Sequence, residues 1–155
     1  MKGKLNSKLL KYWLFAFLLI SGCERIGDDR EKITSRISAL NEADNKANLA
    51  GILACYADTI VFSTPGKSDL RGKAAIEKNY VQLFSANRLD IKIGISSIDI
   101  GKSIVTVQGF VTGRRIANDQ TTSNIYDQYI MSLSKNKNGD WLITKLNWWP
   151  VHNQE

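Results

Sequence analysis

The spacing of apolar residues changes along the chain from a helical to a strand pattern. Over residues 31–57 they recur three and four positions apart, which predicts helix. Within this region the polar segment 41–48 (NEADNKAN) indicates a turn between two helices, or a break within one long helix. A further helix is predicted over residues 73–86, where Ile76, Tyr80, Leu83 and Phe84 form one apolar stripe.

The rest of the pattern is that of β-strands. Residues 59–64 are mainly β-branched and aromatic, and the Pro65-Gly66 pair after them indicates a turn. Alternating apolar positions predict further strands over residues 91–95, 103–113, 126–134 and 141–149. The Asn138-Gly139 pair predicts a hairpin between the last two. We therefore expect one α+β domain over residues 31–150, with its helices packed on one face of a curved antiparallel or mixed sheet.

The first 22 residues have the composition of a secretory signal peptide. Four lysines come first, and the apolar run YWLFAFLLI (residues 12–20) is shorter than the roughly 20 residues that span a bilayer. The signal ends in Ile20-Ser21-Gly22-Cys23, which resembles the bacterial lipobox. The resemblance implies cleavage before Cys23, lipidation of its thiol and stable attachment to a bacterial membrane.

Residues 23–30 would then form a short polar tether. Glu24 follows the lipidated cysteine, which by analogy with Gram-negative lipoproteins favours the periplasmic face of the outer membrane. If the lipobox resemblance is accidental, the same segment is an ordinary secretory signal. With Cys23 lipidated, only Cys55 remains, so no intramolecular disulfide is expected, and Cys55 fits a buried helical position.

Charge and metal-ligating residues narrow the function classes. The whole chain has a formal net charge of +6, but removal of the four signal lysines leaves 17 basic and 15 acidic residues. This balance is unlike the basic surface of a nucleic-acid-binding domain, so we expect no nucleic-acid partner. With His152 the single histidine, we expect no metal and no cofactor.

The order of elements and several short motifs resemble the nuclear transport factor 2-like superfamily, especially its SnoaL-like and ketosteroid isomerase-like branch. The matching segments are Tyr-Ala-Asp at 56–58, the strand and proline turn at 60–65, the helix start at 72–76, and Asp127, Tyr129, Gly139, Trp141 and Trp148 in the last hairpin. The resemblance covers residues 31–149 and implies a cone-shaped sheet with a pocket at its open end. Members of this superfamily catalyse reactions, bind ligands or dimerise through the sheet, so the fold alone leaves the function open.

The resemblance to ketosteroid isomerase can be tested at three positions. That enzyme uses an Asp base together with an oxyanion hole made by a Tyr and a protonated Asp. The matching position for the base holds Thr64, and the position for the Tyr holds Leu40, counted back from Asn45. Only the oxyanion Asp has a counterpart, which is Asp127. A steroid isomerase is therefore not expected, and Asp127 is the one candidate catalytic residue.

Strand alternation predicts which side chains line the pocket. Asp127 shares a strand face with Tyr129, Met131 and Leu133, and alternation with Leu142, Thr144 and Leu146 places Trp148 inside the cone and Trp149 outside. The expected lining residues are Asp127, Tyr129, Trp148, Phe62, Thr64 and Val107. If Asp127 is dry and unpaired, its pKa should be raised. Alternatively, it bonds a Tyr, an Arg or a backbone amide and orders the pocket mouth.

Three functions remain open at this point. In the first, the anchored domain binds a small, largely apolar ligand, with Asp127 as the polar contact. In the second, it is a SnoaL-like cyclase, isomerase or hydrolase that uses Asp127 as an acid. In the third, it is an interaction module that forms a homodimer through the sheet. Arg114-Arg115 fits either an anion site at the rim or a solvated loop.

Overall fold

The computed structural model describes residues 27–151. The expected signal peptide, Cys23 and His152 lie outside this range. The described elements are a helix over residues 27–45, α2 (Leu49–Cys55), β1 (Tyr56–Ser63), β2 (Leu70–Arg71), α3 (Lys73–Ala86), β3 (Asn87–Ile100), β4 (Val105–Ala117), β5 (Thr122–Lys135) and β6 (Trp141–Pro150). No described helix has the length and apolarity needed to cross a membrane.

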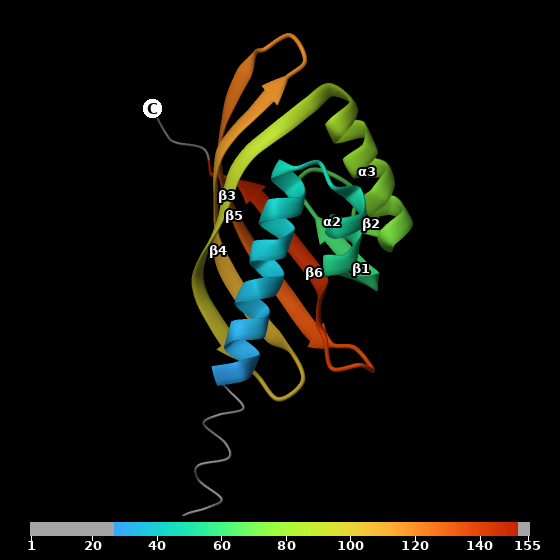
Figure 1. Cartoon of the computed structure of the whole chain (residues 1–155), viewed down its shortest axis with the longest axis vertical. Helices are drawn as coiled ribbons and strands as arrows, with labels where there is room; N and C mark the ends of the chain where they lie inside the picture. Colours follow the sequence, from blue (N-terminus) through green and yellow to red (C-terminus); the bar gives the residue numbers. More distant parts are fainter. Residues whose placement is uncertain (1–26, 152–155) are drawn as a thin grey trace, which may run out of the picture.

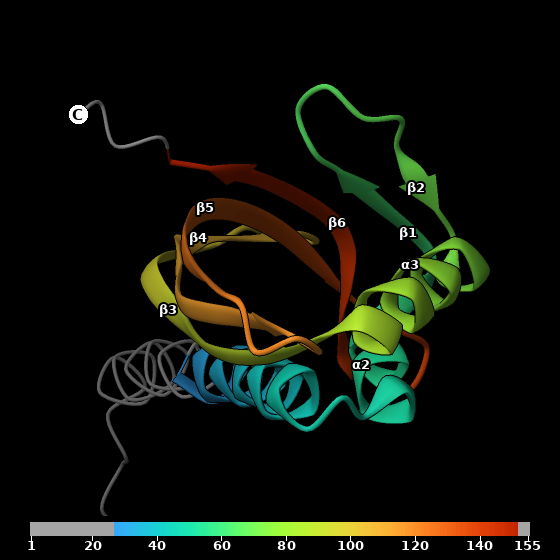
Figure 2. The same cartoon turned by 90° about the horizontal axis from the view of Figure 1, so that it is seen from above.

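The six strands form one sheet in the order β2-β1-β6-β5-β4-β3. β3 to β6 form an antiparallel meander, and β1 pairs in parallel with β6 and antiparallel with β2. The sheet curls without closing, and the helix over residues 27–45 lies along its concave side (Figures 1 and 2). The predicted α+β class, with helices against one face of a curved mixed sheet, is confirmed.

Several element boundaries differ from those predicted. β3 has 14 residues, not five, and continues almost directly from α3. Residues 27–30, expected in a polar tether, belong to the long helix. Asp29 explains why they are ordered: its carboxylate pairs with Lys135 at 2.6 Å and accepts the Trp141 indole N–H at 3.1 Å. The start of the helix is thus attached to the β5–β6 hairpin.

Two asparagines attach the other end of the helix to the edge strand of the sheet. The Asn41 side chain accepts the Ile93 backbone N–H at 2.6 Å. Asn45 both accepts the Ile91 N–H and donates to the Ile91 carbonyl, each at 2.8 Å. These bonds occupy backbone groups that an edge strand would otherwise expose. Asp44 lies between these two asparagines, so the same bonds also fix its position. It is the residue that matters most for the pocket.

A bulge in β6 changes which of its side chains face inward. Leu133 pairs with Ile143 and Ser132 with Lys145, so Thr144 is an extra residue in the strand. Before the bulge Trp141 and Ile143 face the core, and after it Leu146 does. Trp148 therefore points inward as predicted, but the simple alternation that grouped it with Leu142 was wrong.

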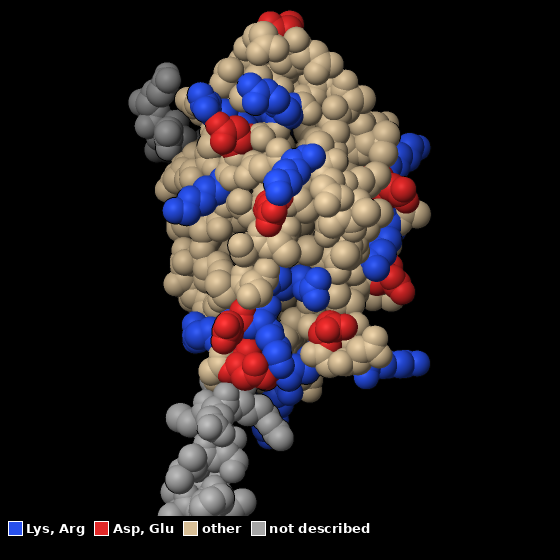
Figure 3. Space-filling model, in the orientation of Figure 1, with Lys and Arg blue, Asp and Glu red and all other residues tan. Residues whose placement is uncertain are grey.

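Charged side chains of both signs are interspersed on the surface. On the face shown in Figure 3, lysine and arginine lie close to aspartate and glutamate, without a broad area of one sign. Pairs such as Lys32–Asp28 and Lys46–Glu42 follow from residues one helical turn apart, each at 2.6 Å. Exposed pairs of this kind contribute only about 0–1 kcal/mol each to stability.

Candidate functional site

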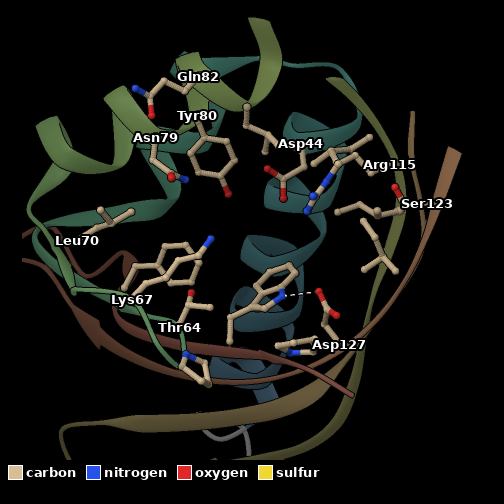
Figure 4. Close-up of a pocket in the computed structure, with 18 of the residues that line it drawn as sticks. Asp44, Thr64, Lys67, Leu70, Asn79, Tyr80, Gln82, Arg115, Ser123 and Asp127 are labelled. Atoms are coloured by element: carbon tan, nitrogen blue, oxygen red, sulfur yellow. Dashed lines mark hydrogen bonds between the residues drawn. The ribbon is translucent and has the colours of Figure 1, made fainter. Parts of the chain in front are cut away.

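A pocket of about 770 Å³ opens between α3, the loop after β1 and the concave face of the sheet. Its volume lies within the roughly 300–1,000 Å³ that is typical of small-molecule sites. Apolar side chains make most of its walls: Phe62, Leu70, Leu83, Leu89, Ile91, Ile125 and Trp148. Polar groups are distributed among them, and the acidic ones are Asp44 and Asp127 (Figure 4).

Asp44 is the most unusual polar residue of the pocket. It comes from the long helix and is only 2% exposed. Its Oδ1 atom has no hydrogen-bond partner among the described residues. Burial raises the pKa of Asp44 to about 7, and the nearby Tyr80 hydroxyl opposes part of that rise. Near neutral pH this carboxyl group therefore exists in both protonation states.

Two tyrosines extend the polar cluster around Asp44. The hydroxyls of Tyr56 and Tyr80 lie 3.5 Å apart, and both side chains are buried. Burial raises the pKa of each phenol, so both remain neutral hydroxyls at any ordinary pH. Tyr80 lines the pocket next to Asp44. The cluster therefore consists of a buried carboxyl group and two neutral hydroxyls.

Asp127 lies on another wall of the pocket and already has a partner. It is partly buried, and its Oδ2 atom accepts the Trp148 indole N–H at 2.7 Å. Trp148 in turn packs edge-on against Phe62, with ring centroids 6.4 Å apart. Asp127 is thus neither dry nor unpaired. Its structural role is to hold Trp148, a partner that was not among those expected from the sequence.

The residues expected to line the pocket separate into two groups. Asp127, Trp148, Phe62 and Thr64 do line it. Tyr129 and Val107 do not, because they are 1% and 0% exposed and belong to the core. The Tyr129 ring lies over Gly109, where a Cβ atom would be 2.7 Å from the hydroxyl, and the hydroxyl donates to the Gly94 carbonyl at 3.0 Å. Expecting both residues in the pocket was therefore wrong.

The positions taken from ketosteroid isomerase are also separated. Thr64 lines the pocket, whereas Leu40 is 1% exposed and lies in the core. Among the described residues, no group of three or more His, Cys, Asp or Glu side chains is placed to hold a metal ion. Cys55 is buried, as expected, and burial raises the pKa of its thiol.

The two adjacent arginines have different environments, and neither lies in a loop. Both belong to β4, so their side chains point to opposite faces of the sheet. Arg114 forms an ion pair with Asp90, while Arg115 lines the pocket together with Lys67. The pair is solvated, since both side chains are exposed, but the expectation that it lies in a loop was wrong.

Asp44 is the site residue that the sequence analysis missed. The polar segment 41–48 was interpreted as a turn, but the helix continues to residue 45 and only residues 46–48 form the turn. The sequence did contain a signal, because Ile33, Ile37, Leu40 and Asp44 follow helical spacing. A carboxylate that continues an apolar stripe is placed on the buried face of its helix.

Comparisons with known proteins agree with this fold. A family model described as SnoaL-like domain matches residues 37–141. A ketosteroid isomerase-like protein from Erwinia carotovora atroseptica superimposes with a TM-score of 0.71 at 20% identity, over 78% of this chain and 95% of that one. None of the curated proteins compared with the chain matches its sequence.

Two further solved structures are similar over most of their length. An NTF2-like protein with a cystatin-like fold from Novosphingobium aromaticivorans has a TM-score of 0.74 at 13% identity, and the match covers 87% of this chain and 90% of that one. A conserved protein from Planctomyces limnophilus has a TM-score of 0.76 at 15% identity, with 81% and 98% covered. At these identities the likeness concerns the fold alone.

Proposed function

The chain belongs to the SnoaL-like domain family, and from this premise we propose that it binds a small, largely apolar ligand in its pocket. One observation carries the proposal: Asp44 is almost fully buried at the pocket wall, yet one of its oxygens has no partner among the described residues. An unsatisfied buried carboxyl oxygen costs free energy, which a ligand would recover by bonding to it.

Asp44 rather than Asp127 is the inner polar contact of this proposal. The Oδ2 atom of Asp127 is already bonded to Trp148, whereas Oδ1 of Asp44 has no hydrogen-bond partner among the described residues. The walls of the pocket as a whole are mainly apolar, and such pockets bind through apolar contact with a few placed polar groups. The expected ligand therefore has an apolar body with a donor or acceptor at its inner end.

A neutral fluorescent probe tests the pocket directly. The chain carrying Cys23→Ser, purified without detergent, should bind N-phenylnaphthylamine with a rise in fluorescence. Leu83→Trp fills the pocket from α3 and should abolish binding. Val81→Trp is the matched control, because Val81 is on the same helix but 53% exposed. Equal fluorescence from both variants, or no binding by the parent chain, contradicts the proposal.

A reaction in the same pocket is the second candidate, and the pKa of Asp44 favours it. A carboxyl group with a pKa of about 7 can both accept and donate a proton near neutral pH, as acid–base catalysis requires. Native mass spectrometry distinguishes this case. If the domain converts its ligand, Asp44→Asn should co-purify with a molecule of different mass from that of the parent chain. The same mass in both contradicts it.

The proposed location is the bacterial cell envelope, with the domain anchored through lipidated Cys23. The support is the lipobox-like segment Ile20-Ser21-Gly22-Cys23, which comes a few residues before the described helix. Cys23→Ser should move the protein from the membrane fraction to the soluble fraction of the envelope. Retention of the variant in the membrane fraction contradicts the anchor.

We also propose that two copies of the chain form a homodimer through the convex faces of their sheets. The observation that favours it is an aromatic pair on that face: Phe110 and Tyr126 stack with centroids 5.7 Å apart, and Tyr126 is 45% exposed. Aromatic residues are enriched at protein interfaces. Sedimentation velocity of the parent chain and of Tyr126→Lys tests it, and a parent chain that sediments as a monomer contradicts it.

A further inference from the structure

Two positively charged side chains reach into the pocket from different walls. Lys67 comes from the loop after β1 and Arg115 from β4, and both line the pocket. Figure 4 shows the Lys67 ammonium and the Arg115 guanidinium directed into it. The described residues form six ion pairs, and neither of these two side chains is in any of them. Within residues 27–151, both charges therefore lack a carboxylate partner.

The backbone on each side holds these positions in place. Residues 64–67 form a turn in which the Lys67 N–H donates to the Thr64 carbonyl at 3.2 Å. Pro65 precedes Gly66, whose φ is +73°, as a type II turn requires, so the base of Lys67 is fixed by turn chemistry. Arg115 pairs across the sheet with Leu89 and Ser123, and both of these line the pocket.

Neither carboxyl group of the pocket forms an ion pair with these two side chains. Asp127 is aligned with Val111, four residues from Arg115, which corresponds to roughly 13 Å along the strand. Asp127 is also bonded to Trp148. Asp44 is partly protonated near neutral pH because of its burial. Two cations without carboxylate partners thus lie beside apolar walls, an arrangement that attracts anions.

We propose that the ligand is an amphiphilic acid, with a carboxylate held by Arg115 and Lys67 and an apolar body in the pocket beyond them. This inference rests on the proposed ligand-binding function and names its substrate class. A guanidinium offers a planar pair of N–H donors that matches a carboxylate, and the Lys67 ammonium adds a second charge. The apolar body contacts side chains such as Leu83, Leu89 and Ile125.

Displacement of the bound neutral probe tests the charge requirement. Decanoate and methyl decanoate have the same apolar chain but differ in charge, so the ratio of their affinities reports the anion contact. In Arg115→Gln we expect decanoate to bind about tenfold more weakly, with the ester unchanged. Arg114→Gln is the matched control, because the Arg114 side chain points to the opposite face of the sheet and pairs with Asp90. Lys67→Gln should weaken decanoate by a smaller factor.

The outcomes separate this inference from the function on which it rests. If the probe does not bind the parent chain, the ligand-binding proposal itself fails. In a second result the probe binds while decanoate and its ester displace it equally, or Arg115→Gln binds decanoate as Arg114→Gln does. Either observation contradicts the proposed anion contact but leaves the ligand-binding proposal standing. A third result would also overturn the inference, namely that Arg115→Gln lowers the free energy of unfolding and raises the pKa of Asp44. That result would mean that Arg115 pairs with Asp44 and not with the ligand.

Discussion

The buried carboxyl group of Asp44 should make the stability of the domain depend on pH in an unusual direction. Burial raises its pKa from 3.8 to about 7 in the folded state. Below about pH 4 the group is protonated whether the chain is folded or unfolded, so it contributes nothing. Between about pH 4 and 7 the unfolded chain releases the proton while the folded chain keeps it. Asp44 therefore destabilises the fold progressively as the pH rises through this window.

The size of the effect follows from the two pKa values. Each pKa unit is worth about 1.4 kcal/mol, so the difference between 3.8 and about 7 amounts to roughly 4 kcal/mol above pH 7. Asp44→Asn has nearly the same shape but cannot ionise. Relative to the parent chain, the variant should become more stable by up to that amount between pH 4 and 8. The new amide adds only a constant offset, because its effect does not depend on pH.

Urea unfolding at several pH values, followed by circular dichroism, measures this difference. The control is Asp99→Asn. It removes the same charge as Asp44→Asn, but from an exposed carboxyl group on β3. Subtracting the parent curve cancels the other carboxyl groups, such as Asp29, whose pKa is lowered mainly by the hydrogen bond from Lys135. A variant-minus-parent difference that stays flat from pH 4 to 8 would refute the reasoning, since Asp44 would then titrate like a solvated carboxyl group.

Two further changes test the sheet beneath the pocket. Gly113→Ala should cost about 1–3 kcal/mol in unfolding free energy, because φ is +139° there and a Cβ atom would lie 2.2 Å from the Asp90 carbonyl oxygen; an unchanged urea midpoint would contradict this. Tyr129→Phe should cost about 1 kcal/mol through the lost bond to Gly94 and leave probe binding intact, since Tyr129 is in the core. Loss of probe binding at unchanged stability would show that Tyr129 does contact the ligand.

Local patterns were enough to predict most of the architecture. Helical spacing identified the segment that became α3, and Asn138-Gly139 marked the β5–β6 hairpin. These features depend on residues close together in the chain, so their physical signal is complete within a short window. Strand lengths were underestimated because the ends of β3 and β5 are stabilised by pairing with β4, which a short window cannot contain.

The candidate site was predicted less well, and the reason is tertiary. Thr64, Phe62, Asp127 and Trp148 do line the pocket, although the alternation used for Trp148 did not allow for the bulge at Thr144. Whether a polar side chain there is free or bonded depends on residues far away in sequence, such as Trp148 for Asp127, 21 positions apart. Asp44 was missed for a local reason: its polar neighbours suggested a turn, although it continues the helical spacing of Ile33, Ile37 and Leu40.

Local spacing and short motifs were enough to predict α3, the antiparallel meander and the family, because each depends on residues close together in the chain. Which groups meet in the pocket depends on contacts between segments that are far apart in the sequence. The fold brings β4, the loop after β1 and the long helix to one pocket, which Arg115, Lys67 and Asp44 line together. Burial then changes what each group can do, because the free energy of a charge depends on its surroundings more than on its neighbours in the chain.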